Sequence, residues 1–310
     1  MGKMVYKTPK NFTAPSVRSF ISDIREIFNL QEKQVSNVFF DVSETENINI
    51  LGALLIYKFL DFTVHKKCFF RPTTNLNLKS SKYIASELKK MGFRQLVEEC
   101  FTEKTLDDEN FTYQENNNCF ISPTVLERNS DISGIGKNNE KRINDYYAYD
   151  ITIASVVLSC IGEISSNFQE HAETDTRSVI LATGDKQHFE VACADNGVGI
   201  LSSLKSNLSV KYRKAPYLIL RKSTEKGVSS KLSEGHMGCG LWLVNEYVTK
   251  AKGYMCIYSE NGYYINKKGI IKCGESPYWK GSIVYVNIPV KDSNVLSEVI
   301  KSIKTREEYF

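Results

Sequence analysis

Three short groups of residues have the types and spacing that chemistry requires. The first is Glu163 and Asn167, four positions apart in a segment with helical periodicity, so both side chains share one helix face. A carboxylate can orient or deprotonate a nucleophile, and a carboxamide oxygen can ligate magnesium. A glutamate and an asparagine on a helix are more often simply solvated, so this pair alone does not establish a site.

The second group, residues 195–199, reads Asp-Asn-Gly-Val-Gly and directly follows a predicted strand. Its glycines, Gly197 and Gly199, allow the backbone to turn sharply and to approach a ligand closely. The carboxylate of Asp195 can accept a hydrogen bond from an exocyclic amine, such as that of adenine. An Asp-Asn-Gly turn without any ligand is the alternative.

The third group, residues 235–241, reads Gly-His-Met-Gly-Cys-Gly-Leu and leads directly into a predicted helix. Backbone N–H groups at a helix N-terminus form a ready anion site, although a plain glycine-rich turn would have the same composition. The pattern is not G-x-x-x-x-G-K-[ST], which excludes a P-loop, and no G-x-G-x-x-G follows the first strand of a βαβ unit.

Alternating helix and strand signals must position these groups. In the second half we expect a helix over 150–172, strands over 178–185 and 189–196, a helix from Gly240, strands over 254–259 and 282–288, and a short charged helix from Asn294. In the first half we expect strands over 37–42 and 68–70, a buried helix over 50–62 and an amphipathic helix over 82–99. This alternation predicts an α/β sandwich.

Composition adds only broad limits. The 310 residues carry a net charge of +4, too weak to indicate nucleic acid, and no run of 18 apolar residues or secretion signal is evident, so we expect a cytoplasmic protein without a membrane span. The eight cysteines include no C-x-x-C pair and are expected to be reduced. Residues 211–231 hold seven basic residues and one acid, which indicates either a solvated loop or a contact with phosphate or an acidic partner.

The order of these motifs resembles the GHKL ATPase superfamily, which includes gyrase-type topoisomerases, sensor histidine kinases and MutL-like proteins. The resemblance covers about 140 residues, near half of the chain. Its residues are Glu163, Asn167 and Glu170 for the helical motif, Asp195, Gly197 and Gly199 for the turn, Gly238, Gly240 and Leu241 for the third motif, and Gly281 with Ser282 for the closing one.

The resemblance implies an α/β sandwich with a mixed sheet that holds ATP between helices and a mobile lid over 202–234. Asn167 would bind Mg²⁺, Asp195 would read the adenine amine, and Glu163 would activate water where ATP is hydrolysed. The other residues expected to contact ATP are Glu170, Gly197, Gly199, Lys226, Ser229, Ser230, Gly235, Gly238, Gly240, Leu241 and Ser282.

The N-terminal half resembles the STAS fold of anti-sigma-factor antagonists over residues 38–60 and the segments that follow. Residues 49–52, Asn-Ile-Leu-Gly, have no hydroxyl where that family carries a phosphorylated serine, so a partner-binding or scaffold role is expected. The predicted division is an STAS-like domain over 1–110, an Asn-rich linker or mobile loop over 111–145, a GHKL domain over 146–290 and a C-terminal helix over 291–310.

These features favour a Mg²⁺-dependent ATPase or an ATP-gated switch that controls binding of a protein partner or homodimer, in bacterial signalling or phage defence. One alternative is a serine/threonine kinase of the anti-sigma-factor type that acts on a partner. Another is a module that binds ATP without hydrolysing it. Histidine autophosphorylation is not expected, because His65 alone precedes Asn167 and lacks an acidic H-E/D box.

Overall fold

The computed structural model describes residues 2–29, 35–65, 69–77, 82–92, 118–126, 132–171, 177–205, 215–228 and 239–307. Its elements in chain order are β1 (Gly2–Lys7), β2 (Asn11–Phe12), the 3-10 helix η1 (Ala14–Ser16), α1 (Val17–Ile24), the 3-10 helix η2 (Arg25–Asn29), β3 (Val35–Asp41), β4 (Asn47–Ile48), α2 (Ile50–His65), β5 (Phe69–Asn77), α3 (Lys82–Lys90), β6 (Cys119–Leu126), α5 (Ile132–Tyr146), α6 (Ile151–His171), β7 (Ser178–Gly184), β8 (His188–Ala194), α7 (Ile200–Lys205), α9 (Tyr217–Ser223), α10 (Gly240–Lys250), β9 (Tyr254–Lys267), β10 (Ile270–Pro289) and α11 (Ser293–Glu307).

The protein is a mixed α/β structure, as the alternation of helix and strand signals predicts. Its largest sheet has five strands in the order β6-β7-β8-β10-β9. A separate three-stranded sheet, β1-β3-β5, is parallel, and β2 and β4 form a short parallel pair. The β9–β10 hairpin turns at Lys268 and Gly269, whose φ angles of 57° and 86° suit a two-residue loop.

The expectation of a mixed sheet in the second half is wrong for the described strands, because every neighbouring pair in the five-stranded sheet is antiparallel. Two helices, α5 and α6, connect β6 to β7, so the chain reverses direction three times between these strands and β7 runs antiparallel to β6. β8 and β9 do run in the same direction, but β10 lies between them.

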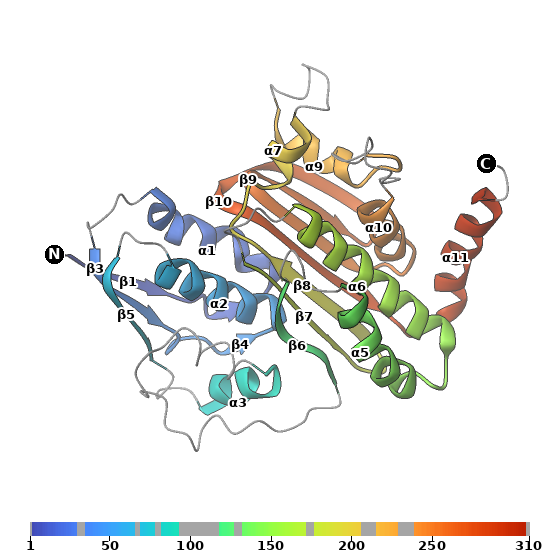
Figure 1. Cartoon of the computed structure of the whole chain (residues 1–310), viewed down its shortest axis with the longest axis horizontal. Coiled ribbons are helices and arrows are strands. Elements are labelled where there is room, and N and C mark those ends of the chain that lie inside the picture. The colour runs from blue at the N-terminus through green and yellow to red at the C-terminus, as the bar shows by residue number, and fades with distance from the viewer. Residues whose placement is uncertain are drawn as a thin grey trace.

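Both faces of the five-stranded sheet are buried, by different helices. Figure 1 shows α1 and α2 on one side of this sheet and α5, α6 and α10 on the other. Alternate strand residues follow this division: Val179 and Leu181 join the core that contains α1 and α2, while Ile180 and Ala182 join the core of α5, α6 and α10. Because helices cover both faces, β7 and β8 are almost continuously apolar instead of alternating.

Helix α2 belongs to the core that joins the two halves of the chain. Its residues from Ile50 to Thr63 are all buried and, apart from Lys58, Asp61 and Thr63, they are apolar on every side of the helix. It contacts β5 of the small sheet and both β7 and β8 of the large sheet. One core therefore includes residues from both predicted domains.

Two predicted boundaries need correction. Residues 119–126 and 132–145, predicted within a linker or mobile loop, form β6 and most of α5. Residues 119–126, Cys-Phe-Ile-Ser-Pro-Thr-Val-Leu, pair with β7, and the polar, Asn-containing α5 packs on α6 through Ile143. The amphipathic helix expected over 82–99 ends at Lys90, where Gly92 with φ 71° terminates it, and residues 93–99 lie outside the described ranges.

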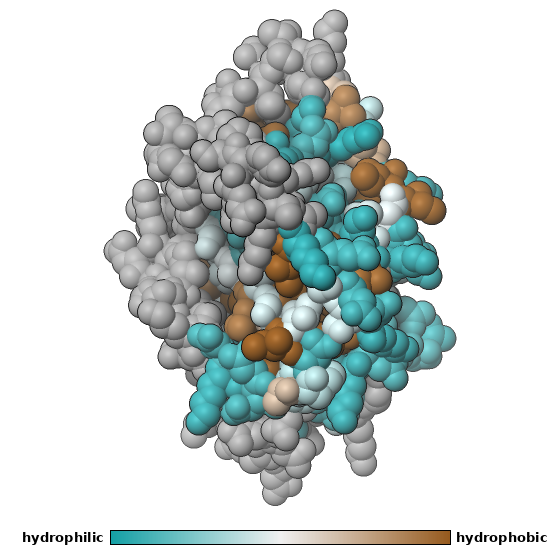
Figure 2. Space-filling view, turned by 90° about the vertical axis from the view of Figure 1, so that its right-hand side faces the viewer, coloured by the Kyte–Doolittle hydropathy of each residue, from teal (hydrophilic) through white to brown (hydrophobic). Residues whose placement is uncertain are grey.

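Within the described residues, one helical window has the length and composition of a membrane span. It is Ile151–Phe168, with a mean hydropathy of 1.4 and half of its residues buried. This window is most of α6, which packs on β7 and β8. Its apolar residues therefore form part of the hydrophobic core. Figure 2 shows the face on the right-hand side of Figure 1, where hydrophilic residues surround small separate apolar groups.

Candidate functional site

The helical pair and the third glycine motif meet in the structure. Glu163 and Asn167 lie on α6, and Gly240 is the first residue of α10. A Cβ atom on Gly240 would lie 2.5 Å from Oε2 of Glu163 and 3.0 Å from Nδ2 of Asn167. A side chain at position 240 would displace the Glu163 carboxylate, so the glycine lets the first turn of α10 lie directly against Glu163 and Asn167.

The Asn167 amide has one of its two ends engaged within its own helix. Its Nδ2 donates a hydrogen bond to the carbonyl oxygen of Glu163 at 2.7 Å. The amide oxygen is therefore the end of this side chain that a magnesium ion would use. Within the described ranges no group of three or more His, Cys, Asp or Glu side chains could hold a metal ion.

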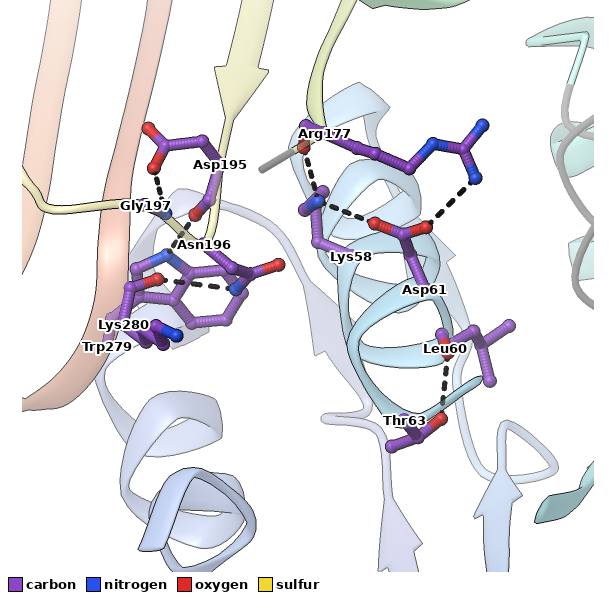
Figure 3. Close-up of polar contacts among 10 residues, drawn as sticks. All are labelled: Lys58, Leu60, Asp61, Thr63, Arg177, Asp195, Asn196, Gly197, Trp279 and Lys280. Atoms are coloured by element: carbon purple, nitrogen blue, oxygen red, sulfur yellow. Dashed lines mark hydrogen bonds and ion pairs between the residues drawn. The ribbon is translucent and has the colours of Figure 1, made fainter. Parts of the chain in front are cut away.

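Asp195 is the first residue after β8, at the same end of the sheet as Asn167. β7 begins shortly after α6 ends, and its Val179 pairs with Ala194, which places the end of α6 close to the end of β8. One carboxylate oxygen of Asp195, Oδ1, accepts a hydrogen bond from the Gly197 amide. Figure 3 shows the second oxygen pointing away from the turn.

Burial raises the pKa of the Asp195 carboxyl from 3.8 to about 6. The Gly197 amide and the ammonium group of Lys58 act against this by stabilising the charged form. Asp195 is partly buried, and its second carboxylate oxygen is a strong acceptor for a ligand donor.

The closing motif holds this turn from β10. Gly281 has φ 93°, and a Cβ there would lie 2.4 Å from Oδ1 and 2.5 Å from the carbonyl oxygen of Asp195. The Asp195 amide donates to the carbonyl of Ser282 at 2.9 Å, and the indole of Trp279 donates to the carbonyl of Asp195 at 3.1 Å. Asn196 adds a bond from its side chain to the carbonyl of Lys280 at 3.3 Å (Figure 3).

Gly199, the second glycine of the turn, lies directly before α7. Gly199 has φ 88°, and Ile200 after it donates its amide to the hydroxyls of Ser259 and Ser282, at 2.9 and 3.0 Å. Ser202 donates its amide to Oε1 of Glu260 at 2.9 Å. The Ser282 hydroxyl, predicted to contact ATP, is thus buried and engaged at the N-terminus of α7.

The remaining predicted residues have different placements. The ammonium group of Lys226 lies 5.3 Å above the ring of Trp242, in the first turn of α10, and Leu241 is buried in the core. Glu170 lies on α6, but its side chain is outside the described part. Ser229, Ser230, Gly235 and Gly238 also lie outside the described residues.

The described parts of the predicted lid pack against the sheet. α7 contributes Leu204 and α9 contributes Ile219 and Leu220 to the same core as α6 and α10. α9 contacts both β9 and β10. Positions 206–214 and 229–234 of the predicted lid are outside the described residues.

Sequence reasoning missed an ionic cluster beside the site. The fully buried Lys58 of α2 donates to Oδ2 of Asp61 at 2.8 Å and to the carbonyl of Arg177 at 2.6 Å, and the Arg177 guanidinium lies 3.3 Å from Oδ1 of Asp61 (Figure 3). Lys58 and Asp61, the two charged residues in the predicted helix over 50–62, were the available signal, because a buried lysine requires a partner.

Comparison with known proteins does not assign this site. No protein-family model, curated protein or solved structure matches the chain.

Proposed function

We propose that the chain binds ATP with Mg²⁺ at the end of the five-stranded sheet where Glu163, Asn167 and Asp195 gather. The observation that carries this proposal is the contact of Gly240 with both Glu163 and Asn167. This contact joins two motifs that are far apart in the sequence, since Asn167 and Gly240 are separated by 73 positions. The third motif, Asp195, lies at the same end of the sheet.

The chemistry of the three side chains fits adenine nucleotide. Asp195 would accept the adenine amine with its second carboxylate oxygen, while Oδ1 stays bonded to Gly197. The oxygen of Asn167 would ligate magnesium, which when bound supplies neutralisation of phosphate charge. The first turn of α10 would present backbone N–H groups to phosphate, with Lys226 beside it over Trp242.

In this proposal Glu163 would act on water. Its carboxylate faces the first turn of α10, where the phosphates would lie. As general base it would take a proton from a water molecule, and that water oxygen would bond to the terminal phosphorus as the bond to the leaving ADP oxygen breaks. We therefore propose an ATPase or ATP-gated switch. Transfer of phosphate to a serine of a partner, and binding without hydrolysis, are the alternatives.

Changing Asp195 to asparagine tests whether this side chain recognises adenine. Asparagine keeps the acceptor for Gly197 but presents no charged oxygen to adenine, so we expect ATP affinity to fall by about 10- to 100-fold. Calorimetric titration with MgATP at pH 7.5 measures this loss. An affinity equal to that of the unchanged protein would show that Asp195 does not read the base.

The same variant should be more stable than the unchanged protein above pH 6. A carboxyl whose pKa rises to about 6 on folding contributes stability below pH 4 that is lost as the pH rises through 6, whereas asparagine stays neutral. The variant should therefore gain about 1–3 kcal/mol at pH 7.5 and little at pH 4. Urea denaturation at the two pH values measures the difference.

A further inference from the structure

Trp279 is the largest fully buried side chain of the described part, and it lies beside the turn that carries Asp195. It occupies an irregular stretch of β10, where the pairing with β9 shifts register on both sides of it. Its indole Nε1 donates to the Asp195 carbonyl at 3.1 Å, across 84 positions of sequence (Figure 3).

Both backbone polar groups of Asp195 are therefore fixed by β10. Its carbonyl accepts from Trp279 and its amide donates to Ser282, on either side of Gly281. With Oδ1 bonded to Gly197, the direction of the second carboxylate oxygen depends on how β10 holds this residue. A loss of the indole bond would free the carbonyl end of the turn.

The Trp279 ring also contacts the N-terminal half of the chain. The ring of Phe28 in η2 meets it edge-on, with centroids 5.3 Å apart and planes at 74°. Phe28 in turn packs edge-on against Phe62 of α2, at 4.9 Å. A continuous aromatic contact thus runs from α2 through η2 to the backbone of Asp195.

We infer that Trp279 is a positioning residue that sets the preference for adenine at Asp195, and that Phe28 connects the N-terminal half to this preference. The inference rests on the proposed function, since it concerns how Asp195 faces the base. Its effect is on selectivity between nucleotides, because guanine offers a carbonyl where adenine offers the amine that Asp195 would bind.

The test compares Trp279→Phe with the unchanged full chain in calorimetric titrations with MgATP and MgGTP. Phenylalanine keeps an aromatic ring against Phe28 but cannot donate to the Asp195 carbonyl. We expect the ratio of ATP to GTP affinity to fall about tenfold, which corresponds to one lost hydrogen bond that orients a charged group. Phe28→Ala, which retains the indole bond, should lower the ratio less but in the same direction.

Tyr147→Phe is the matched control. Tyr147 is also buried, and its ring hydroxyl donates to the backbone carbonyl of Asp185 at 3.0 Å. Asp185 lies in the turn before β8, at the opposite end of this strand from Asp195. This variant should lower the melting temperature without changing the ratio of ATP to GTP affinity. If Trp279 has a merely structural role, Trp279→Phe should behave in the same way.

The outcomes separate the two proposals. If the unchanged chain binds no ATP, the proposed function fails. If it binds ATP selectively and Asp195→Asn removes the selectivity, but folded Trp279→Phe and Phe28→Ala retain it, the inference is overturned. If Trp279→Phe does not fold, Phe28→Ala alone decides, and an unchanged ratio in that variant contradicts the inference.

Discussion

Replacing Glu163 with glutamine should slow phosphate release from ATP by about 10²- to 10⁴-fold and leave the ATP dissociation constant within a few-fold. Glutamine has the shape of glutamate and fits beside Gly240, but it cannot accept a proton from water. Phosphate release at saturating MgATP and calorimetric binding measure the two quantities. Glu298→Gln, an exposed carboxylate-to-amide change on α11, is the matched control and should alter neither.

Unchanged turnover in Glu163→Gln would contradict the assigned role of Glu163. Two other results would decide between the alternatives for the unchanged protein. Radioactive label on a serine of a partner protein would favour the kinase, and ATP that raises the melting temperature without phosphate release over hours would favour a module that only binds.

Replacing Gly281 with alanine should lower the free energy of unfolding by about 2–4 kcal/mol. The residue has φ 93°, and the new Cβ would lie within 2.7 Å of three atoms of the Asp195 turn, including backbone atoms of Asp195 and Gly197 that cannot move aside cheaply. ATP binding should fall with it, because the turn that directs the Asp195 carboxylate would shift. Urea denaturation followed by circular dichroism measures the loss of stability.

Gly269→Ala is the control for backbone strain alone. Gly269 has a similar φ of 86°, but its nearest neighbour to a new Cβ is Cγ2 of Thr249 at 3.6 Å. This variant should lose about 1 kcal/mol and keep ATP binding. If both variants lose the same free energy of unfolding, the contact of Gly281 with the Asp195 turn does not contribute to stability.

The sequence predicted those parts of the protein whose signals are local. The period of α6 and the apolar runs of β7 and β8 depend on neighbouring residues, so their positions were confirmed within a few residues. A sharp turn was expected at Gly197 and Gly199, and Gly199 has φ 88° in the structure, with side-chain and backbone atoms close to where a Cβ would lie. The close approach of Gly281 to the Asp195 turn was not expected from the sequence.

The parts that sequence reasoning missed depend on distant partners. β6 and α5 have weak intrinsic patterns and form through pairing with β7 and packing on α6. The direction of β6 relative to β7 depends on the two helices between them, one of which is the unpredicted α5. The hydrogen bond from Trp279 to Asp195 joins residues 84 positions apart, and a pattern of neighbouring residues cannot predict such a contact.

The most direct test of the adenine-nucleotide site is calorimetric titration of the intact, unchanged chain with MgATP and, separately, with MgGTP. We expect saturable binding of ATP and at least tenfold weaker binding of GTP, because Asp195 would accept the adenine amine and would face a carbonyl in guanine. Absence of ATP binding, or equal affinity for the two nucleotides, would contradict the proposed site.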